Sequence, residues 1–451
     1  MSNGSAERAV VLGGSIAGLL AARVLADVHG EVLVVDRDRF TGPGVRQSVP
    51  QGRHAHGLLA RGQQAVEELF PGLTDELRGA GVPVGDVSAR MRWYVDGHRL
   101  RPGPTGLLII GAARPVLEHH VRARVAALPN VTFVEGHDIA GLAATADGSR
   151  VTGVHVQERV AGSEPRRLDA ALVVDATGRG SRAPKWLRDL GYPEVPEERV
   201  KVDLAYTSRR YRLRTNPFTE EQSINVIATP GHPRGAFFHT LGGGECLLSL
   251  TGLLGDHPPT DPGEFLAYAK SLPVPDIHDA IADAEPLTDP VCFRFPASTR
   301  RHYEQLSRVP DGFLVVGDAF CVFNPVYGQG MTVATLQAQT LRRHLGRGHA
   351  PRPAEFFADA ARVVDAPWEI AAGGDLAFPG VTGRRTVKTN IGNAYVSRVQ
   401  SAATLDAEVT NAFMRVAGLI DPPQALMRPR LALRVLRGAR RAARDDDQLA
   451  A

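Results

Sequence analysis

The sequence predicts an α/β protein in which a buried parallel sheet is interrupted by an inserted antiparallel sheet and followed by a helical C-terminal region. Three observations favour this fold class. Short apolar runs followed by glycine turns and helical periodicity recur near residues 10, 172 and 313. Longer segments that alternate polar and apolar residues lie between residues 201 and 299. From about residue 354 to residue 436 the pattern is mainly helical.

The segment from Ala9 to Asp36 has the pattern of one complete strand–turn–helix–strand unit. Its first apolar run, Val10–Leu12, is typical of a parallel strand buried on both faces. From Ile16 apolar residues recur at helical spacing, and Val32–Val35 predicts a second buried strand that ends at Asp36. Such a βαβ unit is the building block of a Rossmann-like sheet.

The turn inside this unit carries a glycine fingerprint. Its pattern is Gly13-x-Ser15-x-x-Gly18, with Ser15 where the usual fingerprint has its middle glycine. Serine is small enough for a pyrophosphate to approach, and the following helix would direct its free N–H groups and the positive end of its dipole at that phosphate. Asp36 follows Gly18 at close to the spacing of about 20 residues at which an acid reaches a ribose hydroxyl. The unit therefore predicts a dinucleotide-binding site.

A Gly/Pro-rich loop comes next and leads into a predicted helix from about His56 to Leu69. Four polar residues crowd this loop, namely Arg46, Gln51, Arg53 and His54. Each of them could contact a bound phosphate or cofactor ring, or could belong to a solvated turn. The sequence leaves these two alternatives open.

Further elements follow in order along the chain. A hairpin turning at Asp96-Gly97 is predicted within Met91–Leu100, and a helix from Arg114-Pro115 to about Leu128. Buried strands at Leu172–Val174 and from Phe313 end at glycine-containing turns, the second of which is Gly317-Asp318 before a helix from about Gly330. Ligands collect at the carboxyl ends of strands in open α/β sheets, so these turns belong to the predicted site. Strands are also expected at 131–135, 139–146 and 151–158, and, in the inserted antiparallel sheet, at 202–214, 224–228, 235–241, 246–253 and 291–295.

Composition limits the class of protein. The chain has 451 residues, 43% hydrophobic residues and a formal net charge of +3, which suits a globular protein of two or three domains and does not favour nucleic-acid binding. The three cysteines include no C-x-x-C pair, which indicates a reducing compartment. Neither a signal peptide nor a transmembrane segment is evident. We therefore expect a cytoplasmic protein that binds no metal.

With these segments in view, the chain resembles the FAD-dependent monooxygenases of the para-hydroxybenzoate hydroxylase fold. The resemblance runs from about Val10 to Leu345 and depends on three motifs. They are the Gly13-x-Ser15-x-x-Gly18 fingerprint with Asp36, Arg114-x-x-Leu117 at a helix start, and Gly317-Asp318-Ala319 followed by Pro325-x-x-Gly328-Gln329-Gly330. Within this group, the loop Arg46–Gly57 and the helical C-terminal third look most like actinobacterial epoxidases that act on polyene precursors of polyethers.

The resemblance implies roles for individual residues. Asp36 would hold the adenosine ribose, Asp318 the ribityl or pyrophosphate region, and Arg114 the flavin side of FAD. The helix after Pro325 would aim its N-terminus at the pyrimidine edge of the flavin, where reduction deposits negative charge. The full set of expected cofactor-binding residues is Gly13, Gly14, Ser15, Ile16, Ala17, Gly18, Asp36, Arg37, Arg46, Gln51, His54, Arg114, Asp318, Pro325, Gly328, Gln329, Gly330 and Met331.

The implied reaction is that reduced FAD and dioxygen form a flavin hydroperoxide, which passes one oxygen atom to an alkene of an apolar, polyketide-like substrate in specialised metabolism, such as antibiotic biosynthesis. This chemistry belongs to the cofactor, and the protein must exclude water and hold the substrate. Phe237, Phe238 and Phe293 are candidate cavity walls, with simple core packing as the alternative. The rival functions are a hydroxylase, dehydrogenase or reductase on the same scaffold, and a non-redox cyclase that retains FAD as a structural part.

One departure from the family bears on the electron donor. Aromatic hydroxylases usually have an Ala-Asp-Gly turn implicated in the nicotinamide interaction, where this chain has Asp175-Ala176-Thr177-Gly178. NAD(P)H is therefore the expected reductant either directly or through a separate flavin reductase. The domains expected are an FAD-binding domain of residues 1–85, 112–198 and 303–350, a substrate domain of residues 86–111 and 199–302, and a helical region of residues 351–451.

Overall fold

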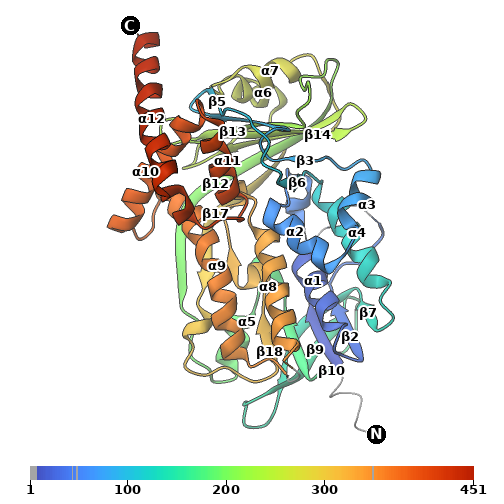
Figure 1. Cartoon of the computed structure of the whole chain (residues 1–451). Coiled ribbons are helices and arrows are strands. Elements are labelled where there is room, and N and C mark those ends of the chain that lie inside the picture. The colour runs from blue at the N-terminus through green and yellow to red at the C-terminus, as the bar shows by residue number, and fades with distance from the viewer. Residues whose placement is uncertain (1–7, 43, 47–48, 348–349, 451) are drawn as a thin grey trace.

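The computed structural model describes residues 8–42, 44–46, 49–347 and 350–450. Its central layer is a five-stranded parallel sheet with the strand order β18-β11-β1-β2-β7 (Figure 1). These strands are Phe313–Val315, Leu172–Asp175, Arg8–Leu12, Glu31–Val35 and Val131–Val134, respectively. The four strands other than the edge strand β7 are almost entirely buried, as expected for parallel strands covered on both faces. The predicted Rossmann-like sheet is therefore present, and the α/β class is confirmed.

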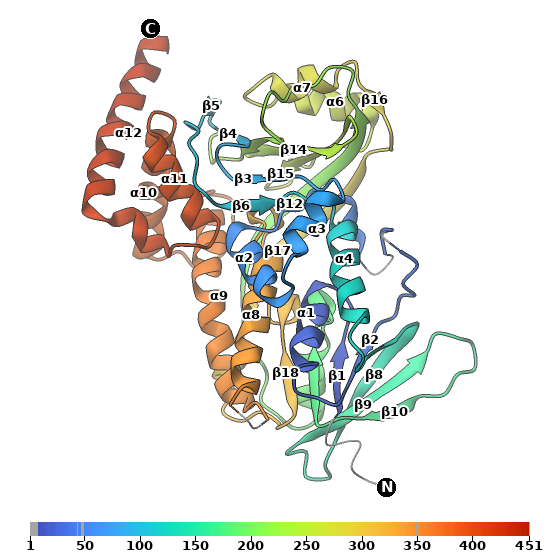
Figure 2. The ribbon, with the colours of Figure 1, turned by 45° about the vertical axis from the view of Figure 1, so that its right-hand side comes forward.

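Helices from distant parts of the chain pack against this sheet. The first is α1 (Ile16–Leu25), which contacts α4 (Arg114–Ala126) and α8 (Gly330–Leu345). The expected core stripe of α8 is buried, from Ala334 through Leu345. Helices α2 (Ala60–Leu69) and α3 (Leu73–Gly79) lie near α8 and α4. At one end of the molecule, a three-stranded sheet of β8 (His137–Ala144), β9 (Val151–Glu158) and β10 (Arg166–Asp169) extends from the parallel sheet (Figure 2).

The prediction that α2 begins at about His56 is wrong. The helix begins at Ala60, because Leu58 forms an isolated antiparallel bridge with Ile110 of β6 (Leu108–Ile110). The backbone N–H of Leu58 donates to the carbonyl of Ile110, and the return bond completes the bridge. The segment before α2 is thereby tied at Leu58 to the short pair formed by β3 (Val84–Asp86) and β6.

The inserted region forms a large sheet with the strand order β19-β17-β12-β15-β14-β13-β4-β5. The bounds are Cys321–Val322, Val291–Arg301, Glu197–Arg212, Glu245–Gly252, Arg234–Gly242, Ser223–Ile227, Met91–Val95 and His98–Arg99, and β16 (Glu285–Pro286) pairs with β12. The sheet is antiparallel except that β4 and β13 run parallel, which the alternation pattern could not predict. The predicted turn at Asp96-Gly97 is confirmed, since β4 and β5 pair around it, and β14 and β15 pair around the glycines 242–244.

Two short helices, α6 (Pro262–Lys270) and α7 (Asp276–Ile281), cover the outer face of this sheet (Figure 1). A hydrophobic cluster fills the space beneath them and includes Phe238, Phe265 and Ile277. These helices were not predicted from the sequence pattern. The opposite face of the sheet looks towards the parallel-sheet layer.

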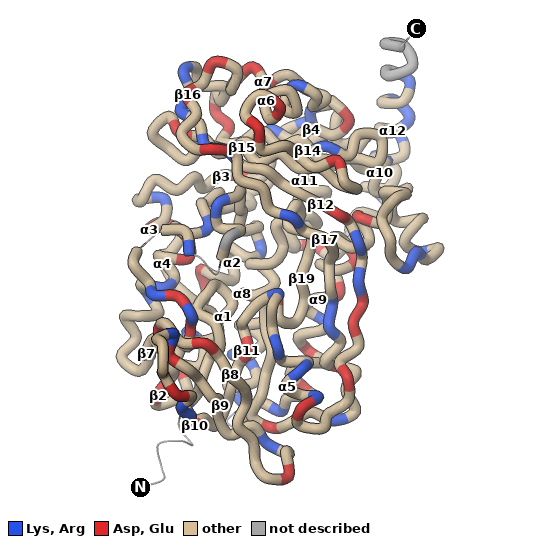
Figure 3. Tube along the Cα trace, turned by 180° about the vertical axis from the view of Figure 1, so that it is seen from behind, with Lys and Arg blue, Asp and Glu red and all other residues tan. Residues whose placement is uncertain are grey.

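The C-terminal part is helical, as predicted, and consists of α9 (Pro353–Asp375), α10 (Val387–Ala403), α11 (Ala407–Ala417) and α12 (Pro429–Ala450). Figure 2 shows α10, α11 and α12 grouped at one side of the molecule near the β4–β5 hairpin. A shared cluster that includes Met91, Leu100, Val399 and Val435 joins the helices to that edge of the sheet. Figure 3 shows charges of both signs scattered along the chain and several basic residues on α12.

Candidate site at the carboxyl edge of the parallel sheet

Two glycine turns lie together where neighbouring strands of the parallel sheet end. Strands β1, β11 and β18 are paired in parallel, so their carboxyl ends share one edge. A Cβ atom on Gly18 would lie 1.7 Å from the Gly13 carbonyl oxygen, and one on Gly317 would lie 2.6 Å from Cβ of Ala17. Gly317 also has a φ of +64°, which favours glycine. The backbone is therefore packed so closely that the fingerprint and the Gly317-Asp318 turn form one surface.

Asp36 lies at the end of β2, with 6% of its surface exposed. Its carboxylate accepts a hydrogen bond from the Gly14 N–H at 2.7 Å. It also forms an ion pair with Arg46 Nη2 at 2.6 Å. Arg46 also contacts Asp38 at 3.0 Å and Glu118 at 2.7 Å. Burial alone would lower the pKa of Arg46, but the charges of Asp36 and Glu118 raise it. Arg46 thus lies beside the predicted ribose-binding acid and neutralises it.

Glu118 of α4 is the third acid that contacts Arg46, and it is not among the residues predicted from the sequence. The Ser15 hydroxyl donates to its Oε2 atom at 2.7 Å, and Arg122 contacts its Oε1 atom at 2.5 Å. Arg114 Nη2 donates to the Ser15 hydroxyl at 3.0 Å. Burial would raise the pKa of Glu118, but Arg114 and Arg46 hold it below the ordinary value. Its position four residues after Arg114, on the same helix face, was the available signal.

Asp318 follows β18 and is half-buried. Burial raises its pKa, and the guanidinium groups of Arg114, Arg179 and Arg301 oppose that rise. Gly330, the first residue of α8, is close enough that a Cβ atom there would lie 3.6 Å from Asp318 Oδ1. The predicted residues Asp318, Arg114 and Gly330 therefore belong to one region.

The N-terminus of α8 contains buried polar atoms without partners. Gln329 is 1% exposed, and neither Oε1 nor Nε2 has a hydrogen-bond partner within the described part of the chain. The Thr332 hydroxyl is also buried and has no hydrogen-bond partner among the described residues. An unpaired buried polar group costs roughly 1–3 kcal/mol, so these atoms suit a bound polar ligand. The close-packed glycines, the partnerless Gln329 and the acids at two strand ends together fit a dinucleotide cofactor.

The loop before α8 is tied to the C-terminal helices. Asp375, at the end of α9, accepts hydrogen bonds from Asn324 Nδ2 at 2.8 Å and from the Tyr327 hydroxyl at 3.2 Å. Its second oxygen is buried without a partner among the described residues. Burial raises the pKa of Asp375 to about 7, although the two hydrogen bonds lower it. The position of the Pro325–Gly328 turn therefore depends on a carboxyl group that titrates near neutral pH.

The inner face of the large sheet meets the extended segment 54–56. His54 Nδ1 lies 2.8 Å from the Ser208 hydroxyl, and the Ala55 N–H donates to the Ser249 hydroxyl at 3.0 Å. The His54 ring packs edge-on against Tyr206 and Phe293, with centroids 4.5 and 5.9 Å apart. Burial, reinforced by Arg53, lowers the pKa of His54 to about 4. His54 therefore packs against the inner face of the large sheet as a neutral ring.

Of the three phenylalanines predicted as cavity walls, not all lie on the inner face of the large sheet. Phe238 is fully buried in the outer cluster under α6 and α7, so its assignment as a cavity wall is wrong. Side chains alternate along a strand, which places the adjacent Phe237 on the inner face. Phe237 and Phe293 are half-buried, and the Arg179 guanidinium lies 5.2 Å from the Phe293 ring centre.

The remaining predicted residues lie partly at the helix starts and partly in the loop after Asp36. Ile16, Ala17 and Met331 lie in the first turns of α1 and α8, and Pro325 and Gly328 bound the turn before α8. Arg37 is exposed and forms no ion pair or hydrogen bond with the described residues. Gln51 lies in the 3₁₀ turn Pro50–Arg53, half-buried. Residues 47 and 48 of the predicted loop lie outside the described residues.

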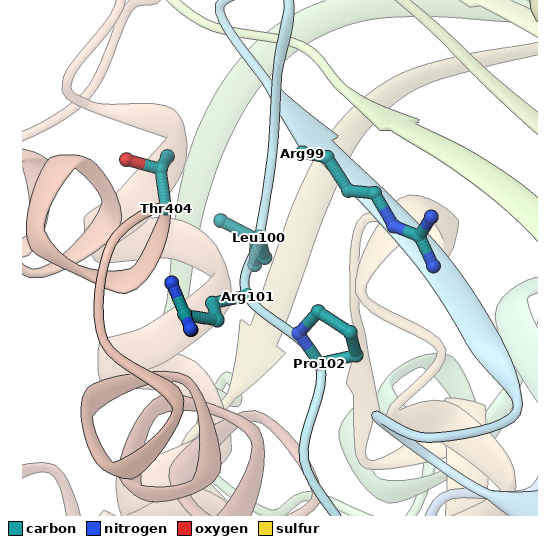
Figure 4. Close-up of a pocket in the computed structure, with 5 residues that line it drawn as sticks. All are labelled: Arg99, Leu100, Arg101, Pro102 and Thr404. Carbon is teal, nitrogen blue, oxygen red and sulfur yellow. The ribbon is translucent and has the colours of Figure 1, made fainter.

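A separate pocket of about 430 Å³ lies between the segment after β5 and the end of α10 (Figure 4). It is lined by Arg99, Leu100, Arg101, Pro102 and Thr404, none of which is a predicted cofactor residue. Among the described residues, no group of three or more His, Cys, Asp or Glu side chains could hold a metal ion. No described helix is long and apolar enough to cross a membrane.

Solved flavoproteins share this architecture. A flavoprotein/dehydrogenase from Cytophaga hutchinsonii superposes with a TM-score of 0.70 at 13% identity, over 98% of this chain and 100% of that one. The p-nitrophenol 4-monooxygenase PnpA of Pseudomonas putida superposes with a TM-score of 0.65 at 15% identity, over 92% and 98%. The chain thus has the fold of flavin-dependent monooxygenases.

Sequence relatives define the family more closely. Protein Rv3254 of Mycobacterium tuberculosis is 34% identical over 433 residues, which cover 92% of this chain and 90% of that protein. This chain therefore belongs to the same family as Rv3254. A kynurenine 3-monooxygenase of Salinispora tropica is 29% identical over 353 residues, covering 73% of this chain and 70% of that one. No family model matches the sequence.

Proposed function

We propose that this protein is an FAD-dependent monooxygenase that transfers one oxygen atom from dioxygen to a small unsaturated substrate. The observation that carries the proposal is the edge of the parallel sheet, where two glycine turns, two strand-end acids and the partnerless Gln329 meet. This edge lies next to a sheet face that bears aromatic side chains. The activity named for the Salinispora relative supports the same class of reaction.

The residues present could hold FAD in the following way. Gly13 to Gly18 would receive the pyrophosphate at the N-terminus of α1, and Asp36 would accept the adenosine ribose hydroxyls once Arg46 turns from the carboxylate to a phosphate. Asp318 would bind the ribityl region, and the N-terminus of α8 would face the flavin. Bound FAD supplies the redox chemistry and the activation of dioxygen.

The side chains of this chain would then position the substrate and exclude water. Phe237, Phe293 and Tyr206 offer apolar surface on the inner face of the large sheet. His54 lies on the same face, against Ser208 and Tyr206. Excluding water protects reactive intermediates from hydrolysis, so we assign these residues to shielding and orientation.

The finer proposal is epoxidation, or hydroxylation, of an olefin of specialised metabolism, with NAD(P)H as the electron source either directly or through a flavin reductase. In this proposal residues 1–85, 112–198 and 303–350 bind FAD, residues 86–111 and 199–302 hold the substrate, and residues 351–451 support the flavin loop. The contact of Asp375 with Asn324 and Tyr327 supports the last assignment.

The test begins with the purified protein. We expect a yellow protein that releases FAD, not FMN, on denaturation, and that converts an olefin into a product heavier by one oxygen atom when reductant and dioxygen are both supplied. Protein that releases no flavin and does not bind added FAD would contradict the proposal. Replacement of Asp318 by Ala should weaken FAD binding by roughly 1.5–3 kcal/mol, the contribution of a charge-assisted hydrogen bond.

A further inference from the structure

The inner face of the large sheet carries many hydrogen-bonding groups. Strand pairing places Asn225 of β13 opposite Phe237, and Ser223 opposite His239. On the other side of β14, Ser249 is opposite Phe237, and Ser208 of β12 is opposite Ser249. Directly opposed residues in a sheet share one face. The space between the two layers is therefore bounded by amide, hydroxyl and imidazole groups as well as aromatic rings.

Most of these polar groups have partners within the chain. Asn225 Nδ2 donates to the Ser223 hydroxyl at 2.8 Å, and the hydroxyls of Ser208 and Ser249 are 2.5 Å apart. His239 differs from them, because its Nε2 atom is buried and has no hydrogen-bond partner in the described part of the chain. The residue is 8% exposed and lies on the same face as Phe237.

His239 is an uncharged ring near neutral pH. Burial lowers its pKa to about 4. The neighbouring His56 has its pKa lowered to about 3 by burial and by the charge of Arg114, although its hydrogen bond to the His54 carbonyl opposes this. A neutral imidazole has one donor and one acceptor nitrogen, so it can pair with a hydroxyl or a carbonyl. It offers no counter-charge to a carboxylate.

We propose that His239 Nε2 forms a hydrogen bond with a hydroxyl or carbonyl oxygen of the substrate, while an unsaturated or aromatic part of the substrate lies against Phe237. The substrate class is thus an oxygen-substituted unsaturated compound and not a plain hydrocarbon. This inference rests on the proposed function, because it places the substrate between the large sheet and the flavin.

A matched pair of probes tests this assignment. 4-Vinylphenol and styrene differ by one hydroxyl, and each would be titrated into the FAD-loaded protein while the flavin absorbance spectrum is recorded. We expect at least tenfold tighter binding of 4-vinylphenol. His239→Phe should abolish that preference and leave styrene binding unchanged, and His239→Gln, which keeps a donor and an acceptor, should retain most of it. His155→Phe on β9 is the matched control and should behave like the unmodified protein.

Several outcomes would overturn the assignment. They are equal binding of the two probes, no binding of either, or an undiminished preference in His239→Phe. Where the phenylalanine variant does not fold, His239→Leu takes its place under the same criteria. Tryptophan fluorescence of a protein in which Trp186 and Trp368 are replaced by Phe reports probe binding at Trp93 without flavin, because Trp93 lies opposite Asn225 on the same face. A protein that binds no FAD but still prefers 4-vinylphenol would therefore refute the proposed function while supporting the role of His239.

Discussion

At the scale of single residues, Arg46 is the side chain that neutralises the acids around the glycine fingerprint. It is 9% exposed and contacts Asp36, Asp38 and Glu118. Arg46→Met would keep much of the volume but remove the ion-pair partner of the buried Asp36, which costs about 3–5 kcal/mol. Urea unfolding of the cofactor-free protein should show this loss, and Arg37→Met, at the exposed neighbour of Asp36, should show almost none. Equal stability of the two variants would contradict the structure of the cluster.

Asp375 gives a prediction about pH. Its pKa is raised to about 7 in the folded protein, against about 3.9 in an unfolded chain. Between these values the folded state holds a proton that the unfolded state has lost, so this group makes stability fall as pH rises from about 4 to about 7. Asn cannot ionise. The gain in stability of Asp375→Asn over the unmodified protein should therefore grow across that window by roughly 4 kcal/mol, since one pKa unit corresponds to about 1.4 kcal/mol.

The measurement is the free energy of unfolding of both proteins at several pH values between 4 and 8. Asp365→Asn is the matched control, because Asp365 is on the same helix but exposed and paired with Arg300. Its difference from the unmodified protein should not grow over that range. A pH-independent difference for Asp375→Asn would show that the carboxyl group does not titrate near 7.

The same residues show what the sequence could and could not predict. Asp36, Asp318 and Gln329 are fixed by motifs a few residues long, and local spacing suffices to find them. Glu118 was accessible from its i+4 spacing to Arg114, and the opposite orientations of Phe237 and Phe238 from strand alternation. Asp375 and His239 were not accessible, because their contacts come from elements far away in the chain that only the folded structure brings together.

At the scale of elements, the strand–turn–helix unit leaves no room for a side chain at Gly18. A Cβ atom there would lie 1.7 Å from a backbone oxygen that cannot move without opening the turn. Gly18→Ala should therefore destabilise the fold by about 1–3 kcal/mol and weaken FAD binding. Thermal unfolding and FAD titration measure the two effects. Gly180→Ala, where nothing lies within 4 Å of the added atom, should be nearly neutral, and equal effects would contradict the packing.

Elements with strong periodicity were predictable, and those defined by pairing were not. The buried strands β1, β2, β11 and β18 and the helix α8 lie where apolar runs indicated. Helices α6 and α7 are short and lie inside a region dominated by strand patterns, so their periodicity was too brief to detect. The late start of α2 results from the bridge between Leu58 and Ile110, and the parallel pairing of β4 with β13 from distant chain contacts.

At the scale of the whole molecule, the same arrangement of two sheets is compatible with several reactions. These reactions differ in their atom balance. A monooxygenase uses dioxygen and two electrons from NAD(P)H, places one oxygen atom in the product and releases the other as water. A dehydrogenase or reductase changes only the hydrogen content of its substrate, and a cyclase yields an isomer. Mass measurement of the product therefore separates these functions on the same fold.

The decisive version of this experiment uses isotopically labelled oxygen. If the proposed function is right, labelled dioxygen puts one labelled atom into the product, and labelled water leaves the product unlabelled apart from any later opening of an epoxide. The reaction must also stop without reductant, because the cofactor must be reduced before it can activate dioxygen. Asp318→Ala protein, with FAD removed, is the matched control and should form no labelled product until FAD is added in large excess. An isomeric product formed under nitrogen with oxidised flavin would instead establish a cyclase, in which the two sheets fold the substrate by shape and FAD is only part of the wall.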